Sequence, residues 1–470
     1  MKSSGKSRVR NPMRKRLGLS VCLVLLASEE NLSWAVPGDS EPMRNEATAP
    51  VLQLTLEQAM DIALSPTGNA RVQIAEELIE QARARSAQAR AALLPNIDAG
   101  VSEQSLTRNL EVFGLQFATP IQGFPFQTFV GPFKVFDARA TASQSVFDLS
   151  SILKYKASRT GISLAEAEKE STQDQTRDLV ARAYLSGLRA KANLVAAQAN
   201  LQLAEALLKL ATDSKDAGAG TGIEVTRARV QLANERQRLL VAQNDQRRSG
   251  LQLLKAIGLD LDTTVELTDN LSLLPVTPLT PQQALRVALE SRADWKAQQK
   301  REQASQQAAK AVKMERLPSL SVFGDYGSSG LAIDDSVPTR TVGLHVAIPV
   351  FDGGRRDARR AESYSLLRQE SIRSRDLRAQ IELETRTALD NLQSASEQVK
   401  AAEEGVELAT NELAQAERRY RAGVGSSIEV TDAQTRLERA RDNHIVALFN
   451  HSMARVDLST ATGTIRQMIQ

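Results

Sequence analysis

Residues 341–354 read Thr-Val-Gly-Leu-His-Val-Ala-Ile-Pro-Val-Phe-Asp-Gly-Gly, and the first part of this stretch has the two-residue period of a β-strand. Asp352 is suited to capping the start of a helix, and Gly353 and Gly354 allow the chain to turn before it. The stretch therefore predicts a strand that leads directly into a helix. The apolar residues of the strand alternate with small or polar ones. These apolar residues are Val342, Leu344, Val346 and Ile348.

The segment after this stretch is predicted to be a long helix, because no proline occurs from Val350 to the end of the chain. Alanine recurs there every seven residues, and larger residues fill the other seam position. This pattern is typical of a coiled coil in which alanine lets two helices approach closely. The alanines are Ala388, Ala395, Ala402, Ala409 and Ala416, and the larger residues are Leu392, Val399, Val406, Leu413 and Tyr420.

A second alanine seam lies in the first half of the chain, where no proline occurs between Pro132 and Pro275. It starts at Ala183 and matches the later seam at an offset of 205 residues, which brings position 183 onto position 388. The motif Ala-Gly-x-Gly followed by Glu-Val-Thr also occurs twice at this offset, at 217–226 and 422–431. The chain is therefore predicted to be an internal duplication, with repeats at 51–278 and 279–470.

Each repeat also contains a predicted β-hairpin, at about 96–147 and at about 318–351, with one apolar and one mostly polar face. Four strands cannot close a barrel, and lipid does not tolerate open strand edges. The smallest membrane-spanning barrels have about eight strands, so several chains would have to share one barrel. The alternation leaves one alternative open, in which both hairpins pack on a soluble core.

The N-terminus is predicted to be a signal peptide, residues 1–35, followed by a flexible linker, residues 36–50. Seven basic residues precede an apolar run that is too short to span a bilayer, and Ser33-Trp34-Ala35 offers small residues for cleavage. Cys22 lies inside this leader, and its lipidation is the disfavoured alternative because the apolar run continues past it. Removing the seven basic and two acidic residues of the leader lowers the formal net charge from +3 to −2, which argues against a nucleic-acid partner.

Together, the duplication, the two glycine turns and the strand that ends in Phe-Asp-Gly-Gly resemble the TolC-like outer-membrane efflux protein family (outer membrane factors). The resemblance implies a mainly α fold with transmembrane β structure: a long coiled-coil α-helical barrel, and four strands per protomer in a trimeric twelve-stranded β-barrel. It implies a homotrimer in the lipid of the outer membrane with a long periplasmic extension. The partners implied are a periplasmic adaptor (membrane fusion protein) and an inner-membrane pump, in multidrug efflux or type I secretion.

By this resemblance, the glycines of the two turns mark hairpin tips that dock the adaptor: Gly218, Gly220, Gly222, Gly423 and Gly425. Glycine permits the positive φ that reverses two packed helices. The glycines alone are equally compatible with a turn that binds nothing.

The resemblance also places Glu429, Asp432 and Tyr420 at the periplasmic entrance of the pore. Spacing i, i+3 puts the two carboxylates on one helix face, and three copies would form rings of negative charge that favour cations. The alternatives are an ordinary solvated helix face for the carboxylates and packing in the heptad seam for Tyr420. Gly425 stands where the family has a gate arginine, although Arg419 and two further arginines are close in sequence.

No catalytic or metal-binding motif stands out, so the sequence predicts neither an enzyme nor a bound cofactor or metal. His444 and His451 are a heptad apart, which is not the i, i+4 spacing of a helical metal pair. The main competing hypothesis is a non-conducting coiled-coil scaffold of the bacterial envelope. The strand hairpins favour the channel, because a scaffold needs no lipid-facing alternation.

Overall fold

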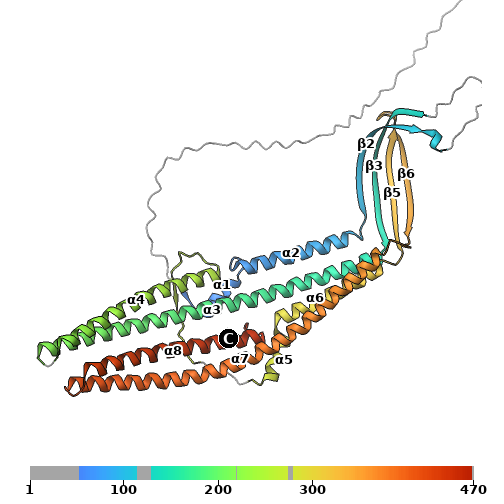
Figure 1. Ribbon diagram of the computed structural model, residues 1–470. Helices are drawn as coiled ribbons and strands as arrows, with labels where there is room; N and C mark the ends of the chain where they lie inside the picture. Colours follow the sequence, from blue (N-terminus) through green and yellow to red (C-terminus); the bar gives the residue numbers. More distant parts are fainter. Residues whose placement is uncertain (1–51, 114–128, 219, 274–278, 468–470) are drawn as a thin grey trace, which may run out of the picture. The chain divides into compact units, whose positions relative to one another are not determined.

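The computed structural model describes residues 52–113, 129–218, 220–273 and 279–467 (Figure 1). The predicted signal peptide at 1–35, the linker at 36–50 and Cys22 lie outside these residues. None of the helices in the described ranges combines the length and the apolar composition that a membrane crossing requires.

Two very long helices dominate the fold, as the proline-free stretches predict. Helix α3, Leu149–Asp216, has 68 residues, and α7, Arg355–Arg421, has 67. At 1.5 Å per residue, each is about 100 Å long. Each turns back into a shorter antiparallel helix: α4, Gly222–Ile257, after α3, and α8, Ser427–Thr462, after α7.

An aspartate near the start of each long helix accepts hydrogen bonds from backbone N–H groups of the first helical turn. Asp148 is the N-cap of α3, and its carboxylate accepts hydrogen bonds from the backbone N–H groups of the first turn, at 2.9 Å from Ser150. The corresponding prediction for Asp352 is wrong by two residues. Gly354, with φ of +84°, is the N-cap of α7, and Asp352 accepts from the N–H of Arg356 at 3.2 Å.

The shorter elements repeat in the same order and confirm the duplication. The first repeat has α1, Leu56–Leu64, and α2, Ala70–Ala91, and the second has α5, Pro281–Ser291, and α6, Ala293–Met314. Helices α1 and α5 both begin with a capping box, formed by Thr55 with Gln58 and by Thr280 with Gln283. Among the described residues, the first repeat also has a short parallel pair, β1, Leu52–Leu54, with β4, Val265–Leu267.

A four-stranded antiparallel sheet lies at one end of the long helices (Figure 1). Its strands are β2, Asn96–Asn109, β3, Phe129–Phe147, β5, Ser319–Gly330, and β6, Val337–Ala347, with a 3₁₀ turn at Leu110–Phe113 after β2. The strand order is β2-β3-β5-β6, so β3 and β5 join the hairpins of the two repeats. Among the described residues, β2 and β6 each pair on one side only.

The two faces of this sheet differ in chemistry. Opposite one another on one face lie Val322 and Leu344, and Leu344 is 72% exposed. On the other face, Arg139 forms ion pairs with Asp137 at 2.5 Å and with Asp325 at 3.1 Å. Alternation along each strand therefore gives the sheet one apolar and one polar face, as predicted. Further exposed side chains of the apolar face are Ile97, Val101, Tyr326, Val342 and Val346.

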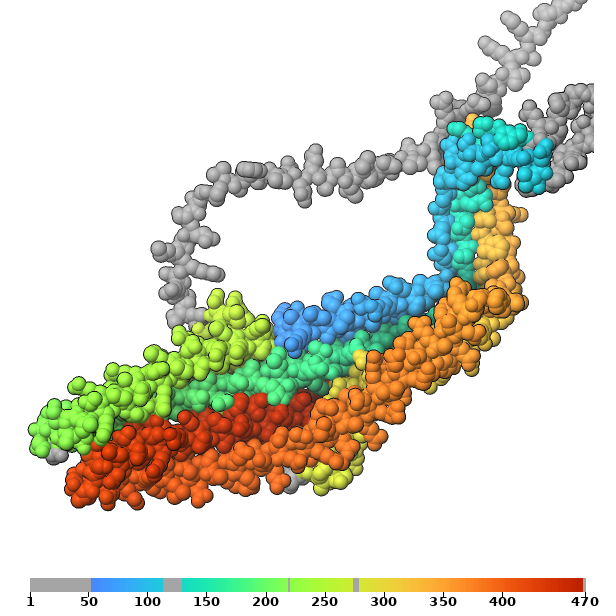
Figure 2. Space-filling model, viewed as in Figure 1, coloured from blue at the N-terminus to red at the C-terminus, as the bar shows by residue number. Residues whose placement is uncertain are grey.

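The helical hairpins pack through the predicted alanine seams, which explains how a chain with 4% aromatic residues fills its interior. Two buried clusters join α7 to α8, and α8 also packs along α3, so the two hairpins lie side by side (Figure 2). One cluster contains Ala388, Leu392, Ala395, Ala454, Leu458 and Ala461, and the other contains Ala409, Leu413, Ala416, Val430, Ala433 and Leu437.

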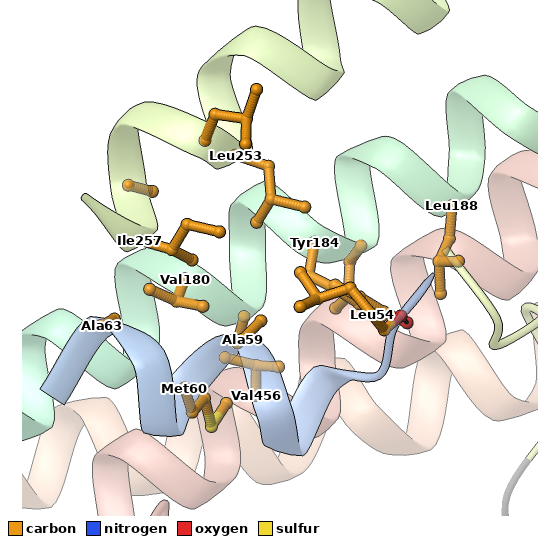
Figure 3. Packing of buried hydrophobic residues seen from close by; sticks show 14 residues of the cluster. Leu54, Ala59, Met60, Ala63, Val180, Tyr184, Leu188, Leu253, Ile257 and Val456 are labelled. Carbon is orange, nitrogen blue, oxygen red and sulfur yellow. Dashed lines mark hydrogen bonds between the residues drawn. The ribbon is translucent and has the colours of Figure 1, made fainter. Parts of the chain in front are cut away.

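The largest buried cluster lies where α1 and the β1–β4 pair pack on α3, α4 and α8 (Figure 3). Tyr184 of α3 is its largest side chain and is 1% exposed. The Tyr184 hydroxyl donates to the Asp269 carboxylate at 2.6 Å and lies 2.9 Å from the carbonyl oxygen of Leu54. Burial and the Asp269 charge raise the pKa of Tyr184, so the phenol remains a donor that ties β1 to α3.

Candidate functional site

The turn between α3 and α4 lies at the end of the helices remote from the sheet (Figure 1). Gly218 has φ of +76°, a conformation that favours glycine. Gly220 donates its N–H to the carbonyl oxygen of Ser214 at 2.9 Å, and a Cβ at Gly220 would lie 2.9 Å from the nitrogen of Lys215. Gly218 therefore allows a backbone conformation that other residues rarely adopt, and Gly220 allows the backbone at Lys215 to lie close to it.

The turn between α7 and α8 has the same construction. Gly423 has φ of +73°. Gly425 donates its N–H to the carbonyl oxygen of Arg419 at 3.1 Å, and a Cβ there would lie 2.9 Å from the Cβ of Arg419. Of the five glycines in the two turns, only Gly218 and Gly423 adopt the positive φ that glycine permits. Gly222 is the first residue of α4 and has open space around its Cβ position, so its conformation does not require glycine.

The structure pairs Glu429 with an arginine of its own hairpin. The Nε of Arg419 lies 3.2 Å from a Glu429 carboxylate oxygen, and both side chains are about half exposed. Another nitrogen of Arg419 donates to the carbonyl oxygen of Val424 at 3.3 Å. Exposed ion pairs contribute about 0–1 kcal/mol, so this contact orients Glu429 more than it stabilises the turn. Asp432 lies one helical turn further along α8 and is exposed.

Tyr420 packs inside the helix layer, as the seam alternative predicts. It contacts the buried cluster of Leu413 and Val430 and lines a cavity of about 30 Å³, which is large enough to hold water. Its hydroxyl is buried and has no hydrogen-bond partner in the described part of the chain. Gln434, 1% exposed, lines the same cavity, and its amide nitrogen is likewise unpartnered among those residues.

A polar layer that sequence reasoning missed lies next to this cavity, between α4 and α8. Glu235 is 0% exposed and Glu438 is 3% exposed, and both accept from the side chains of Gln231 and Arg238. The sequence does contain a signal for this polar layer. Glu235 occupies a seven-residue series whose other members are small: Ala228, Ala242, Ser249 and Ala256.

No metal centre accompanies these groups in the ranges that the structure describes, since no three His, Cys, Asp or Glu side chains are placed to hold an ion.

Comparison with known proteins identifies the family and the fold of the chain. The sequence model of the family described as outer membrane efflux protein matches residues 67–259 and 284–464. A curated relative, the pyoverdine export outer membrane protein OpmQ of Pseudomonas putida, is 26% identical over 421 residues. That alignment covers 87% of this chain and 85% of the relative.

Solved structures share the fold at low sequence identity. The CmeC outer membrane channel of Campylobacter jejuni is 17% identical with a TM-score of 0.74, over 87% of this chain and 85% of that chain. The outer membrane protein VceC of Vibrio cholerae is 18% identical with a TM-score of 0.72, over 87% of this chain and 96% of that chain.

Proposed function

The chain belongs to the outer membrane efflux protein family, and from this premise we propose that three copies form one duct that receives substrates from an inner-membrane pump. The protein is an outer-membrane efflux channel rather than an enzyme, and its long helices extend into the periplasm. In the proposed assembly, substrates pass through the periplasm inside the helical part and leave through a barrel that the three sheets share.

The observation that carries the proposal is the four-stranded sheet with two unlike faces and two edge strands. In lipid, each unpaired backbone N–H or C=O group costs several kcal/mol, so a sheet with open edges cannot remain alone there. Pairing β2 of one copy with β6 of the next would satisfy both edges. The apolar face would then lie against lipid and the face with Arg139 and Asp325 would line the lumen.

Both hairpin turns present apolar side chains, which supports docking of a periplasmic adaptor. Ile223 in the first turn of α4 is 58% exposed, and its equivalent Ile428 in α8 is 50% exposed. Val424, between the two glycines of the second turn, is 67% exposed. Contiguous exposed apolar patches mark interaction sites, and docking of an adaptor on the turns would remove these side chains from water.

Replacing Ile223 and Ile428 together by aspartate tests the duct's partners. We expect the variant to assemble in the outer membrane, because both side chains are exposed. We expect it not to restore export to a strain from which the gene for this channel has been deleted. In-cell cross-linking followed by co-purification should recover the adaptor and the pump with the wild type and not with the variant. The substitution Leu251→Asp, at a 48% exposed position far from the turns on α4, is the matched control. Full export by the double variant would contradict docking at the tips.

The relationship to OpmQ supports small-molecule efflux, rather than type I protein secretion, as the transport route of this channel. OpmQ exports pyoverdine, and the relationship extends over most of both chains. A strain lacking this channel should therefore accumulate small molecules that its pump handles. Loss of a secreted protein with unchanged small-molecule export would support the secretion route instead.

Removing the carboxylates near the second turn tests the proposed pore entrance. In a trimer, Glu429 and Asp432 would supply six negative charges. The three copies of Arg419 that pair with Glu429 would offset half of them, and the remaining negative charge attracts cations and repels anions. We expect the double variant Glu429→Gln, Asp432→Asn to lower the ratio of cation to anion permeability, measured as the reversal potential in planar bilayers under a salt gradient. Glu57→Gln on α1, about 50 Å away along α3, is the control. An unchanged ratio would place the two carboxylates outside the pore.

A further inference from the structure

The contact between the two helical hairpins contains two carboxyl groups removed from water. Glu235 belongs to α4 of the first hairpin and Glu438 to α8 of the second, and both are almost completely buried. They share their hydrogen-bond donors. The amide nitrogen of Gln231 lies 2.9 Å from Glu235 and 3.2 Å from Glu438, and Arg238 lies 3.2 Å and 2.6 Å from the same two groups.

The guanidinium of Arg238 therefore binds both carboxylates, and one oxygen of Glu235 has no hydrogen bond from the described residues. The second carboxylate oxygen of Glu235 is buried and has no hydrogen-bond partner among the described residues. Burying an ionised carboxylate with one oxygen left without a hydrogen bond is costly, whereas a protonated carboxyl carries no charge. The geometry favours a single proton held at Glu235 while Glu438 keeps the ion pair with Arg238.

The surrounding charges act on Glu235 in both directions. Asp442 of α8 adds a second negative charge that raises the pKa of Glu235, whereas the positive charge of Arg238 lowers it. Helix α3, which packs on both α4 and α8, contributes the neutral Asn200, whose side-chain oxygen accepts from Arg441 at 2.9 Å. Burial, followed by the charge of Glu438, raises the pKa of Glu235 above its ordinary value.

We propose that Glu235 and Glu438 form a proton-controlled joint between hairpin α3–α4 and hairpin α7–α8. When Glu235 is protonated, the layer has one carboxylate for one guanidinium, and the two hairpins stay in contact. When Glu235 loses its proton, two buried carboxylates repel each other across the joint, and the hairpins separate. Because the folded-state pKa is raised, the contact strengthens as the pH falls through that pKa and weakens as it rises. The hairpin tips would thereby respond to periplasmic acidity.

Infrared difference spectra of the purified full assembly test the protonation. The carbonyl stretch of a protonated carboxyl should titrate above the ordinary glutamate range, about 4.3, in the wild type. It should disappear in Glu235→Gln and persist in Glu403→Gln, an exposed carboxylate of α7. Glu438→Gln should lower the midpoint by about one pH unit because a repelling charge is removed, and Arg238→Gln should raise it by about one unit.

Spin labels across the joint test its movement. Asn234 of α4 and Arg439 of α8 are exposed, and the only cysteine of the chain, Cys22, lies in the predicted leader. With both positions changed to labelled cysteine, the shortest label separation should increase as the pH rises, and Glu235→Gln should abolish the increase. A pH-independent separation, or an increase that survives Glu235→Gln, would overturn the proposal. If Glu235→Gln does not assemble, the midpoints of Glu438→Gln and Arg238→Gln test the proposal instead. Shifts in opposite directions would support it, and the absence of such shifts would overturn it. Neither measurement involves transport, so the result is independent of the efflux assignment.

Discussion

Arginine in place of Leu344 is expected to remove the protein from the outer-membrane fraction. Leu344 lies on the apolar face of β6 and is 72% exposed in the single chain. An arginine on the lipid face of a membrane barrel costs about 2–4 kcal/mol near the bilayer midplane. Three copies would each bear this cost in the proposed assembly, so membrane insertion and export should both fail. Fractionation of cell envelopes and an export assay measure the two effects.

His345 provides the control, because neighbouring residues of a strand point to opposite faces. His345→Arg adds the same side chain to the polar face, where it would meet the lumen, and the protein should still insert. The difference between the two variants depends on the assignment of the faces and not on the general effect of an added charge. If His345→Arg failed and Leu344→Arg inserted, the apolar face would have to line the interior of the channel.

The second large effect is expected from Tyr184→Ala, which empties the centre of the largest buried cluster. Tyr184 is 1% exposed, and replacing a buried aromatic side chain by alanine costs about 3–5 kcal/mol. The change also removes the hydroxyl that joins the β1 carbonyl of Leu54 and Asp269 to α3. The unfolding temperature of the detergent-extracted protein, followed by helical circular dichroism, should fall.

Tyr184→Phe separates packing from hydrogen bonding at the same position. Phenylalanine keeps the ring, and Asp269 retains its hydrogen bond from the N–H of Leu56 at 3.1 Å, so the loss should be about 1 kcal/mol. Tyr364→Ala on α7, where the ring is half buried, should also have a small effect. Equal losses for the alanine and phenylalanine variants at position 184 would show that the hydroxyl, rather than the ring, stabilises this region.

The features predicted correctly from sequence are those that depend on a local repeat. Alternation in residues 341–348 specifies both faces of β6, because the strand period is two residues. The alanines at 388, 395, 409 and 416 specify the buried seam of α7, because the coiled-coil period is seven residues. Both patterns are visible without knowledge of the partner element.

The features that sequence reasoning missed depend on how distant segments meet. Glu235 and Glu438 are about 200 residues apart, and they share Arg238 only because α8 lies beside the first hairpin. Backbone geometry in the turns explains the other differences. Gly425 is needed for its close approach to Arg419 rather than for a positive φ. Helix α7 begins only after Gly353 and Gly354, so Asp352 is not its N-cap.

The number of chains in the purified outer-membrane assembly tests the central claim most directly. One chain supplies four strands with β2 and β6 at the edges of the described sheet, and three such sheets are proposed to share one barrel. Native mass spectrometry of the protein, extracted from the outer membrane in mild detergent, should give the mass of three copies. A detergent-extracted, folded protein with the mass of a single copy would contradict the proposed duct.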